Sequence, residues 1–129
     1  MRWLVFALTI LAIGFFAHNL IGKKGTFWHI ARGLLAFLLP LAVVVINTVS
    51  VSSARGPNWD AVFYAHFWLG VLFFLSLLYT IFYGYRMKRS VPHSPEYVFR
   101  KKFHRIFAYS SAIFLFCSLA FAVVMRFVR

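Results

Sequence analysis

Residues 103–128, "FHRIFAYSSAIFLFCSLAFAVVMRFV", form a nearly unbroken apolar run behind a basic segment. A run of this kind is long enough to cross a hydrocarbon core of about 30 Å as an α-helix, which takes about 20 residues. Three further apolar runs cover residues 3–21, 27–49 and 61–85. Alternation of apolar and polar residues at strand length is absent, so the runs predict helices rather than a barrel. The sequence therefore predicts an all-α membrane protein with four transmembrane helices.

The composition agrees with this class, since 63% of the residues are hydrophobic, 21% are aromatic and only two are acidic. A soluble domain has about a quarter of its residues charged. Short connections predict that successive helices pack as antiparallel neighbours, so we expect residues 1–129 to form a single four-helix transmembrane domain. The first run resembles a signal peptide, but Lys23 and Lys24 follow it, and we interpret it as a retained helix.

The formal charge of +12 is distributed by loop, not along one face, which argues against nucleic-acid binding. Most cations lie between the first two runs or between the last two, in the segment 86–102. The positive-inside rule places both basic segments in the cytoplasm and both termini outside, an N-out/C-out topology. Setting this topology and contacting anionic headgroups is a sufficient role for most of these cations. We expect Pro92 and Pro95 to break any helix in the segment 86–102, leaving a loop that contacts headgroups or a partner subunit.

A histidine inside a membrane needs a partner and is a functional candidate by default. In the predicted topology His18, His29 and His104 lie near the cytoplasmic side, whereas His66 lies about 20 Å away along the membrane normal. His29 and His104 are each close to the start of their helices, and these helices run in the same direction. Their rings are therefore expected at matching heights, as two axial imidazoles of one b-type haem require. The near absence of carboxylates excludes acid/base pairs and di-metal carboxylate sites.

Neighbouring residues suit such a haem. Gly33 and Ala108 follow His29 and His104 by four positions and so share their helix faces, where a small side chain leaves room for a macrocycle edge. Close helix packing explains small residues equally well. Arg32 is a candidate partner for the haem propionates, with snorkelling to the interface as its alternative. The cations Lys101, Lys102 and Arg105 could serve the propionates equally well.

The other two membrane histidines have open roles. His18 is a candidate alternative axial ligand or hydrogen-bond partner for a quinone, and helix-end snorkelling explains it equally well. His66 is a candidate for hydrogen bonding to a backbone carbonyl or to a partner subunit.

Three segments resemble four-helix transmembrane b-type cytochromes related to ascorbate-reducible cytochrome b: "HIARGLLAFLLP" (29–40), "AHFWLG" (65–70) and "KFHRIFA" (102–108). In that family four histidines hold two haems, pairing helix one with helix three and helix two with helix four. His29 and His104 match the second pair. His18 stands at the wrong end of its helix to face His66, so the first pair does not carry over, and the resemblance implies a relative with a single haem or with none. Membrane anchors of quinone-linked dehydrogenases are similar in size and in their use of histidines between helices.

These observations predict a small cytochrome b subunit that carries electrons between quinone or quinol and a partner redox protein. Other membrane redox subunits are its expected partners, and an energy-transducing membrane, with the bacterial inner membrane favoured, is its expected location. The alternative is a non-catalytic accessory or structural subunit of a larger respiratory or photosynthetic membrane complex. In either case we expect the protein to be at most an electron-transfer subunit of an oxidoreductase complex.

Overall fold

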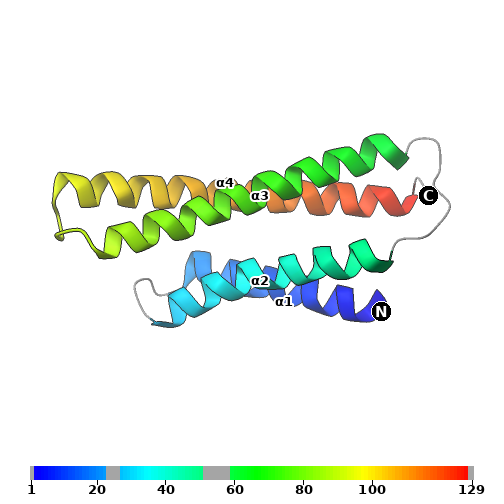
Figure 1. The fold of residues 1–129 in the computed structure, drawn as a ribbon, viewed down its shortest axis with the longest axis horizontal. Coiled ribbons are helices and arrows are strands. Elements are labelled where there is room, and N and C mark those ends of the chain that lie inside the picture. The colour runs from blue at the N-terminus through cyan, green and yellow to red at the C-terminus, as the bar shows by residue number, and fades with distance from the viewer. Residues whose placement is uncertain (1, 23–26, 51–58, 128–129) are drawn as a thin grey trace. The chain divides into compact units, whose positions relative to one another are not determined.

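A computed structural model describes residues 2–22, 27–50 and 59–127 of the chain. These residues form four helices, α1 (Arg2–Ile21), α2 (Phe27–Ser50), α3 (Trp59–Lys88) and α4 (Pro95–Phe127). The all-α fold class is therefore confirmed (Figure 1). Lys23 and Lys24, which contribute to the predicted topology, lie outside the described residues.

Each helix contains a segment long and apolar enough to cross a membrane. The candidate spans are Trp3–Ile21, Phe27–Ile46, Asp60–Lys88 and Pro95–Phe127. The helices α3 and α4 contain 30 and 33 residues, which is more than the about 20 residues that the hydrocarbon core requires. These two helices therefore continue beyond the hydrocarbon region.

The chain divides into two compact units, Met1–Ser53 and Ala54–Arg129. Each unit is an antiparallel helical hairpin, α1 with α2 and α3 with α4 (Figure 1). The expectation of one four-helix bundle concerns packing between the hairpins and stays a prediction.

The segment between α3 and α4 differs from the expected loop, because α3 continues to Lys88 and α4 begins at Pro95 rather than near residue 103. The expectation that Pro95 breaks a helix was wrong. Proline is favoured at the first helical position, where its missing N–H has no helical partner to lose and its φ already suits the helix. Ser94 caps this end, since its Oγ accepts a hydrogen bond from the Tyr97 N–H at 3.1 Å.

The interior of the α3–α4 hairpin combines large apolar residues with small hydroxyl residues. Phe73 and Leu77 are buried, and so are Ser76, Thr80, Ser111 and Ser118. Small residues let membrane helices approach closely. The Thr80 hydroxyl donates to the Ser76 carbonyl at 2.8 Å and the Ser111 hydroxyl to the Phe107 carbonyl at 2.7 Å, so neither polar group is buried without a partner.

Candidate functional site

His104 on α4 binds the backbone of α3. Its Nδ1 lies 2.8 Å from the carbonyl oxygen of Thr80. A carbonyl oxygen can only accept a hydrogen bond, so Nδ1 carries the proton and, in the neutral ring, Nε2 carries the lone pair. The backbone of α3 thus selects the tautomer of His104 that presents Nε2 as the basic nitrogen.

Gly84 explains how the imidazole reaches this carbonyl. A helical side chain covers the turn on the N-terminal side of its own Cα, so the side chain at position 84 would lie over the Thr80 carbonyl. A Cβ at Gly84 would approach His104 Cε1 to 3.0 Å and Nδ1 to 3.1 Å. The space that a side chain would occupy at position 84 is therefore taken by the imidazole of His104.

His66 on α3 makes the corresponding contact with α4. Its Nδ1 lies 2.8 Å from the Ser118 carbonyl oxygen and 3.0 Å from Ser118 Oγ. The Ser118 hydroxyl lies 3.4 Å from the His66 carbonyl oxygen, to which it donates. One assignment satisfies all three contacts, with Nδ1–H shared between the carbonyl and hydroxyl oxygens of Ser118. His66 therefore adopts the same tautomer as His104, and a backbone carbonyl is its partner, one of the two alternatives that the sequence left open.

The two contacts define one antiparallel register. Fourteen positions separate His66 from Thr80 on α3, and the same number separates His104 from Ser118 on α4. At 1.5 Å per residue the two contacts lie about 21 Å apart along the hairpin. Halfway between them on α4 is Ser111, whose exposed fraction is 0%. Each helix therefore carries one histidine and, fourteen positions further on, a hydroxyl residue whose backbone carbonyl accepts a hydrogen bond from the histidine of the opposite helix.

An aromatic cluster lies beside the His104 contact. Tyr79 stacks on Phe107, with ring centroids 5.1 Å apart and planes at 21°. Tyr83 stacks on both Phe103 and Phe107, at 5.4 Å and 5.8 Å. These four rings join α3 and α4 in the same helical turns that carry Thr80 and His104.

The other predicted residues belong to the α1–α2 hairpin. The guanidinium of Arg32 and the ring of His18 both lie against Gly22, because a Cβ there would meet Arg32 Nη2 at 3.3 Å and His18 Nδ1 at 3.4 Å. Gly33 lies against Asn19 of α1, whose Nδ2 would be 3.3 Å from an added Cβ. Arg32 is half-buried, and its Nε is buried without a hydrogen-bond partner among the described residues. The unit Met1–Ser53 contains no acidic residue, so this hairpin supplies no carboxylate for the cation.

The structure thus places the predicted residues in two groups. His66, His104 and Ala108 lie in the α3–α4 hairpin, and His18, His29, Arg32 and Gly33 lie in the α1–α2 hairpin. Because the units are described separately, the pairing of His29 with His104 stays a prediction.

Sequence reasoning missed Thr80, Gly84 and Ser118 as partners of the histidines. The available signal was the seven-residue spacing of His104, Ser111 and Ser118, which places the three on one face of α4.

The helices and their composition define the class of this chain, a four-span integral membrane protein. Comparison with protein-family models, curated proteins and solved structures gave no match. Its function is therefore argued from the chemistry of its own residues.

Proposed function

We propose that this protein is a small membrane cytochrome b subunit in which His104 is an axial ligand of one haem b. The observation that carries the proposal is the bond from His104 Nδ1–H to the Thr80 carbonyl. Metal-binding histidines nearly always donate their other ring N–H to a carbonyl, a carboxylate or water, which orients the ring and raises the basicity of the ligand nitrogen. The proposal includes membership of the family related to ascorbate-reducible cytochrome b.

The two histidines of the α3–α4 hairpin cannot share one iron atom. Their contacts with the opposite helix are about 21 Å apart along the hairpin axis. A bis-histidine haem that uses His104 therefore takes its second ligand from another segment. The expectation that His104 lies close to the start of its helix was wrong, because α4 begins at Pro95. His29 is still the candidate, because the apolar runs 27–49 and 103–128 predict similar depths for the two rings. His66 is left with a structural role, its hydrogen bond to Ser118 of the opposite helix, which agrees with the proposal of a single haem.

Arg32 suits the propionates of such a haem. A guanidinium forms bidentate hydrogen bonds with carboxylates, and this one lies in a hairpin without an acidic residue. The stacked rings of Tyr79, Tyr83 and Phe107 offer an apolar wall of the kind that a macrocycle edge or a quinone ring contacts. The bound haem would supply the one-electron chemistry, and the protein would supply ligands, a tautomer and a low-dielectric environment.

The test is a reduced-minus-oxidised optical spectrum of the purified protein, with the iron content measured per polypeptide. We expect the α band of a b-type haem and one iron atom per chain. His104→Ala and His29→Ala should abolish the band. His66→Ala is the matched control, since it removes an imidazole with the same kind of backbone bond and should leave the band in place. A wild-type protein without the band, or with a band that persists in His104→Ala, contradicts the proposal.

The second candidate is a non-catalytic accessory subunit of a larger respiratory or photosynthetic membrane complex. It is favoured by the many large apolar side chains exposed on both hairpins, for example Trp28 at 68% and Trp68 at 60%. Such rings contact pigments, partner helices or lipid. Purification with large membrane partners, without iron and with unchanged assembly in the histidine variants, would support this candidate over the haem protein.

A further inference from the structure

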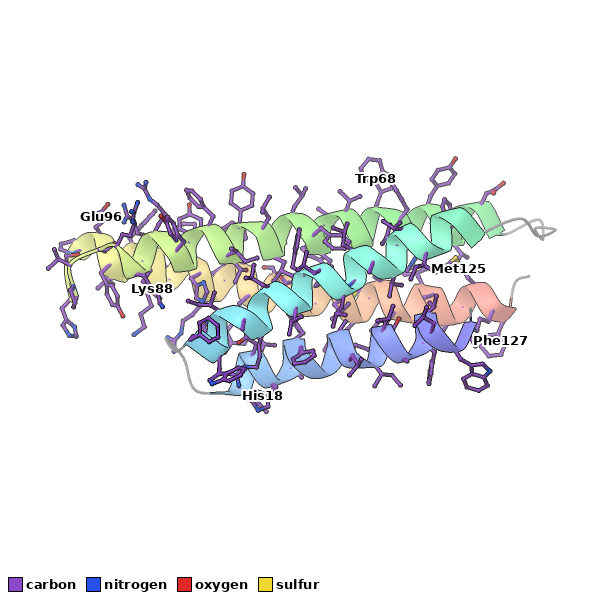
Figure 2. All side chains as sticks on the ribbon, turned by 60° about the horizontal axis from the view of Figure 1, so that its bottom comes forward. His18, Trp68, Lys88, Glu96, Met125 and Phe127 are labelled. Carbon is purple, nitrogen blue, oxygen red and sulfur yellow. The ribbon has the colours of Figure 1, made fainter. Side chains whose placement is uncertain are left out.

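Six exposed cations surround the end of the α3–α4 hairpin at which the two helices are joined. They come from both helices and the adjoining turn: Arg86, Lys88, Arg89, Lys101, Lys102 and Arg105. Figure 2 shows Lys88 and Glu96 at this end of the hairpin, with Met125 and Phe127 toward the other end. We call this region the basic end. The whole chain has two acidic residues, Asp60 in the first turn of α3 and Glu96, so its own carboxylates leave the basic end strongly positive.

Arg100 has a separate role in the same region. Its guanidinium pairs with Glu96 and donates from Nη1 to the Arg86 carbonyl at 2.8 Å and to Ser90 Oγ at 2.7 Å. The side chain of Arg100 is only 12% exposed, whereas that of Glu96 is 61% exposed. Arg100 therefore holds the C-terminal turn of α3 against the first turns of α4. Glu96, the acidic residue of the basic end, is engaged in this contact. The six exposed cations belong to the helical turns that Arg100 holds together.

Three of the exposed cations lie over aromatic rings. Arg89 is 5.1 Å from the Tyr85 centroid, Arg86 is 5.9 Å from the Phe82 centroid, and Lys101 is 5.8 Å from that of Tyr97. A guanidinium that covers a ring with its face keeps its N–H edge available for phosphate oxygens. Tyrosine and other amphipathic rings concentrate where hydrocarbon meets headgroups. The cations are therefore combined with the residue types of a membrane interface.

The lengths of α3 and α4 place the basic end at the headgroups. Their 30 and 33 residues correspond to helices about 45 and 50 Å long, whereas the hydrocarbon core is about 30 Å thick and the bilayer with its headgroups about 40–45 Å. The apolar part of each helix fills the core, so the basic turns extend into the phosphate layer. At the other end of α4, within its described residues, the last turn contributes Arg126 as its cation.

We propose that the basic end binds the phosphate groups of anionic phospholipids in preference to zwitterionic ones, with Arg86, Arg89 and Lys101 as principal contacts. Exposed apolar side chains are interspersed with the cations, among them Val98 at 59% and Phe99 at 54%. This mixture favours a lipid layer over a nucleic acid or an acidic soluble protein, which would leave these apolar groups against water. None of the three contacts is a proposed ligand of iron, and Lys101 is the one among them that the sequence also offered to the haem propionates.

The test uses the full-length protein in a neutral detergent with equimolar phosphatidylglycerol and phosphatidylcholine, and native mass spectrometry counts the bound lipids. We expect the wild type to retain phosphatidylglycerol selectively. The triple variant R86Q/R89Q/K101Q should lose that preference, because each cation near a lipid surface contributes about fivefold to the affinity. Arg126→Gln, which removes an exposed cation from the opposite end of α4, is the control and should retain it.

Circular dichroism and detergent-induced unfolding will show whether the triple variant keeps the wild-type fold, and the three side chains are exposed, so we expect that it does. Equal binding of both lipids by the wild type overturns the proposal. So does an undiminished preference for phosphatidylglycerol in the folded triple variant. Displacement of phosphatidylglycerol by oligodeoxythymidylate at equal phosphate concentration would show that the surface takes a soluble polyanion, and it also overturns the proposal.

Discussion

Replacing Gly84 by alanine places a methyl group 3.0 Å from Cε1 and 3.1 Å from Nδ1 of His104. These distances are shorter than ordinary carbon–carbon and carbon–nitrogen contacts, so the imidazole must shift by a few tenths of an ångström, and we expect this shift to weaken or break its hydrogen bond to the Thr80 carbonyl. Loss of a hydrogen bond of this kind costs about 0.5–1.5 kcal/mol. Alanine in place of a helical glycine contributes up to about 1 kcal/mol in the opposite direction. The net change for Gly84→Ala is therefore expected to lie near zero or to be slightly destabilising.

Gly70 of the same helix provides the matched control, because a Cβ there would meet no described atom within 4 Å. Gly70→Ala should give the helical gain alone, so the two variants are expected to differ by about 0.5–1.5 kcal/mol in unfolding free energy. The assay is reversible unfolding of the full-length protein in mixed micelles by sodium dodecyl sulfate. Nitrogen NMR of the imidazole gives a second readout, since His104 should lose its fixed Nδ1–H tautomer in Gly84→Ala and keep it in Gly70→Ala.

A double-mutant cycle completes the test. In a His104→Ala background the two glycine replacements should have the same effect, because the ring that distinguishes them is gone. Equal effects of Gly84→Ala and Gly70→Ala in the wild-type background, with the tautomer of His104 preserved, would refute the argument that Gly84 gives the imidazole access to α3.

Three further predictions concern the turn between α3 and α4, all measured by the same unfolding assay. Arg100→Gln removes the donor to the Arg86 carbonyl and should destabilise the hairpin by about 1–2 kcal/mol. Glu96→Gln should cost less than about 0.5 kcal/mol, because the side chain of Glu96 is 61% exposed. Equal losses in the two variants would mean that the ion pair, and not the carbonyl contact, stabilises the turn. Ser94→Ala removes the N-cap of α4 and should cost about 1 kcal/mol, with Ser94→Asp as the conservative control that retains most of the stability. His93 has a φ of 65°, in the left-handed region that a β-branched side chain disfavours and glycine adopts freely. His93→Val should therefore cost about 1–2 kcal/mol of unfolding free energy, and His93→Gly should be tolerated. A tolerated valine would contradict the left-handed conformation.

The four helices were predictable from the sequence because hydropathy and length determine a transmembrane helix almost without reference to tertiary contacts. The end of α3 and the start of α4 were not, because their basic turns lack the apolar signal and Pro95 occurs both where helices break and where they begin. Ser94 immediately before Pro95 was the local signal that decides between these possibilities. A proline preceded by a capping residue is therefore better interpreted as a helix start.

The partners of the histidines were less accessible. Depth along the membrane normal separates His66 from His104, but the carbonyls that bind them belong to the opposite helix, so their identity depends on the register of α3 against α4. Sequence reasoning interpreted small residues as gaps on each histidine's own helix, at Gly33 and Ala108. That reasoning did not consider Gly84 of the opposite helix, which the structure places against His104. Register is a tertiary property, and nothing in one helix alone determines it.

The two imidazole–carbonyl bonds of the α3–α4 hairpin also restrict how it can move. Both belong to the same alignment, so sliding one helix past the other by a single turn, about 5.4 Å, would break both at once and leave polar groups without partners in a low-dielectric layer. Small gradual slippage is opposed at two points far apart along the axis. We therefore expect the hairpin to resist sliding of α3 along α4, so that a displacement imposed at one end moves both helices together.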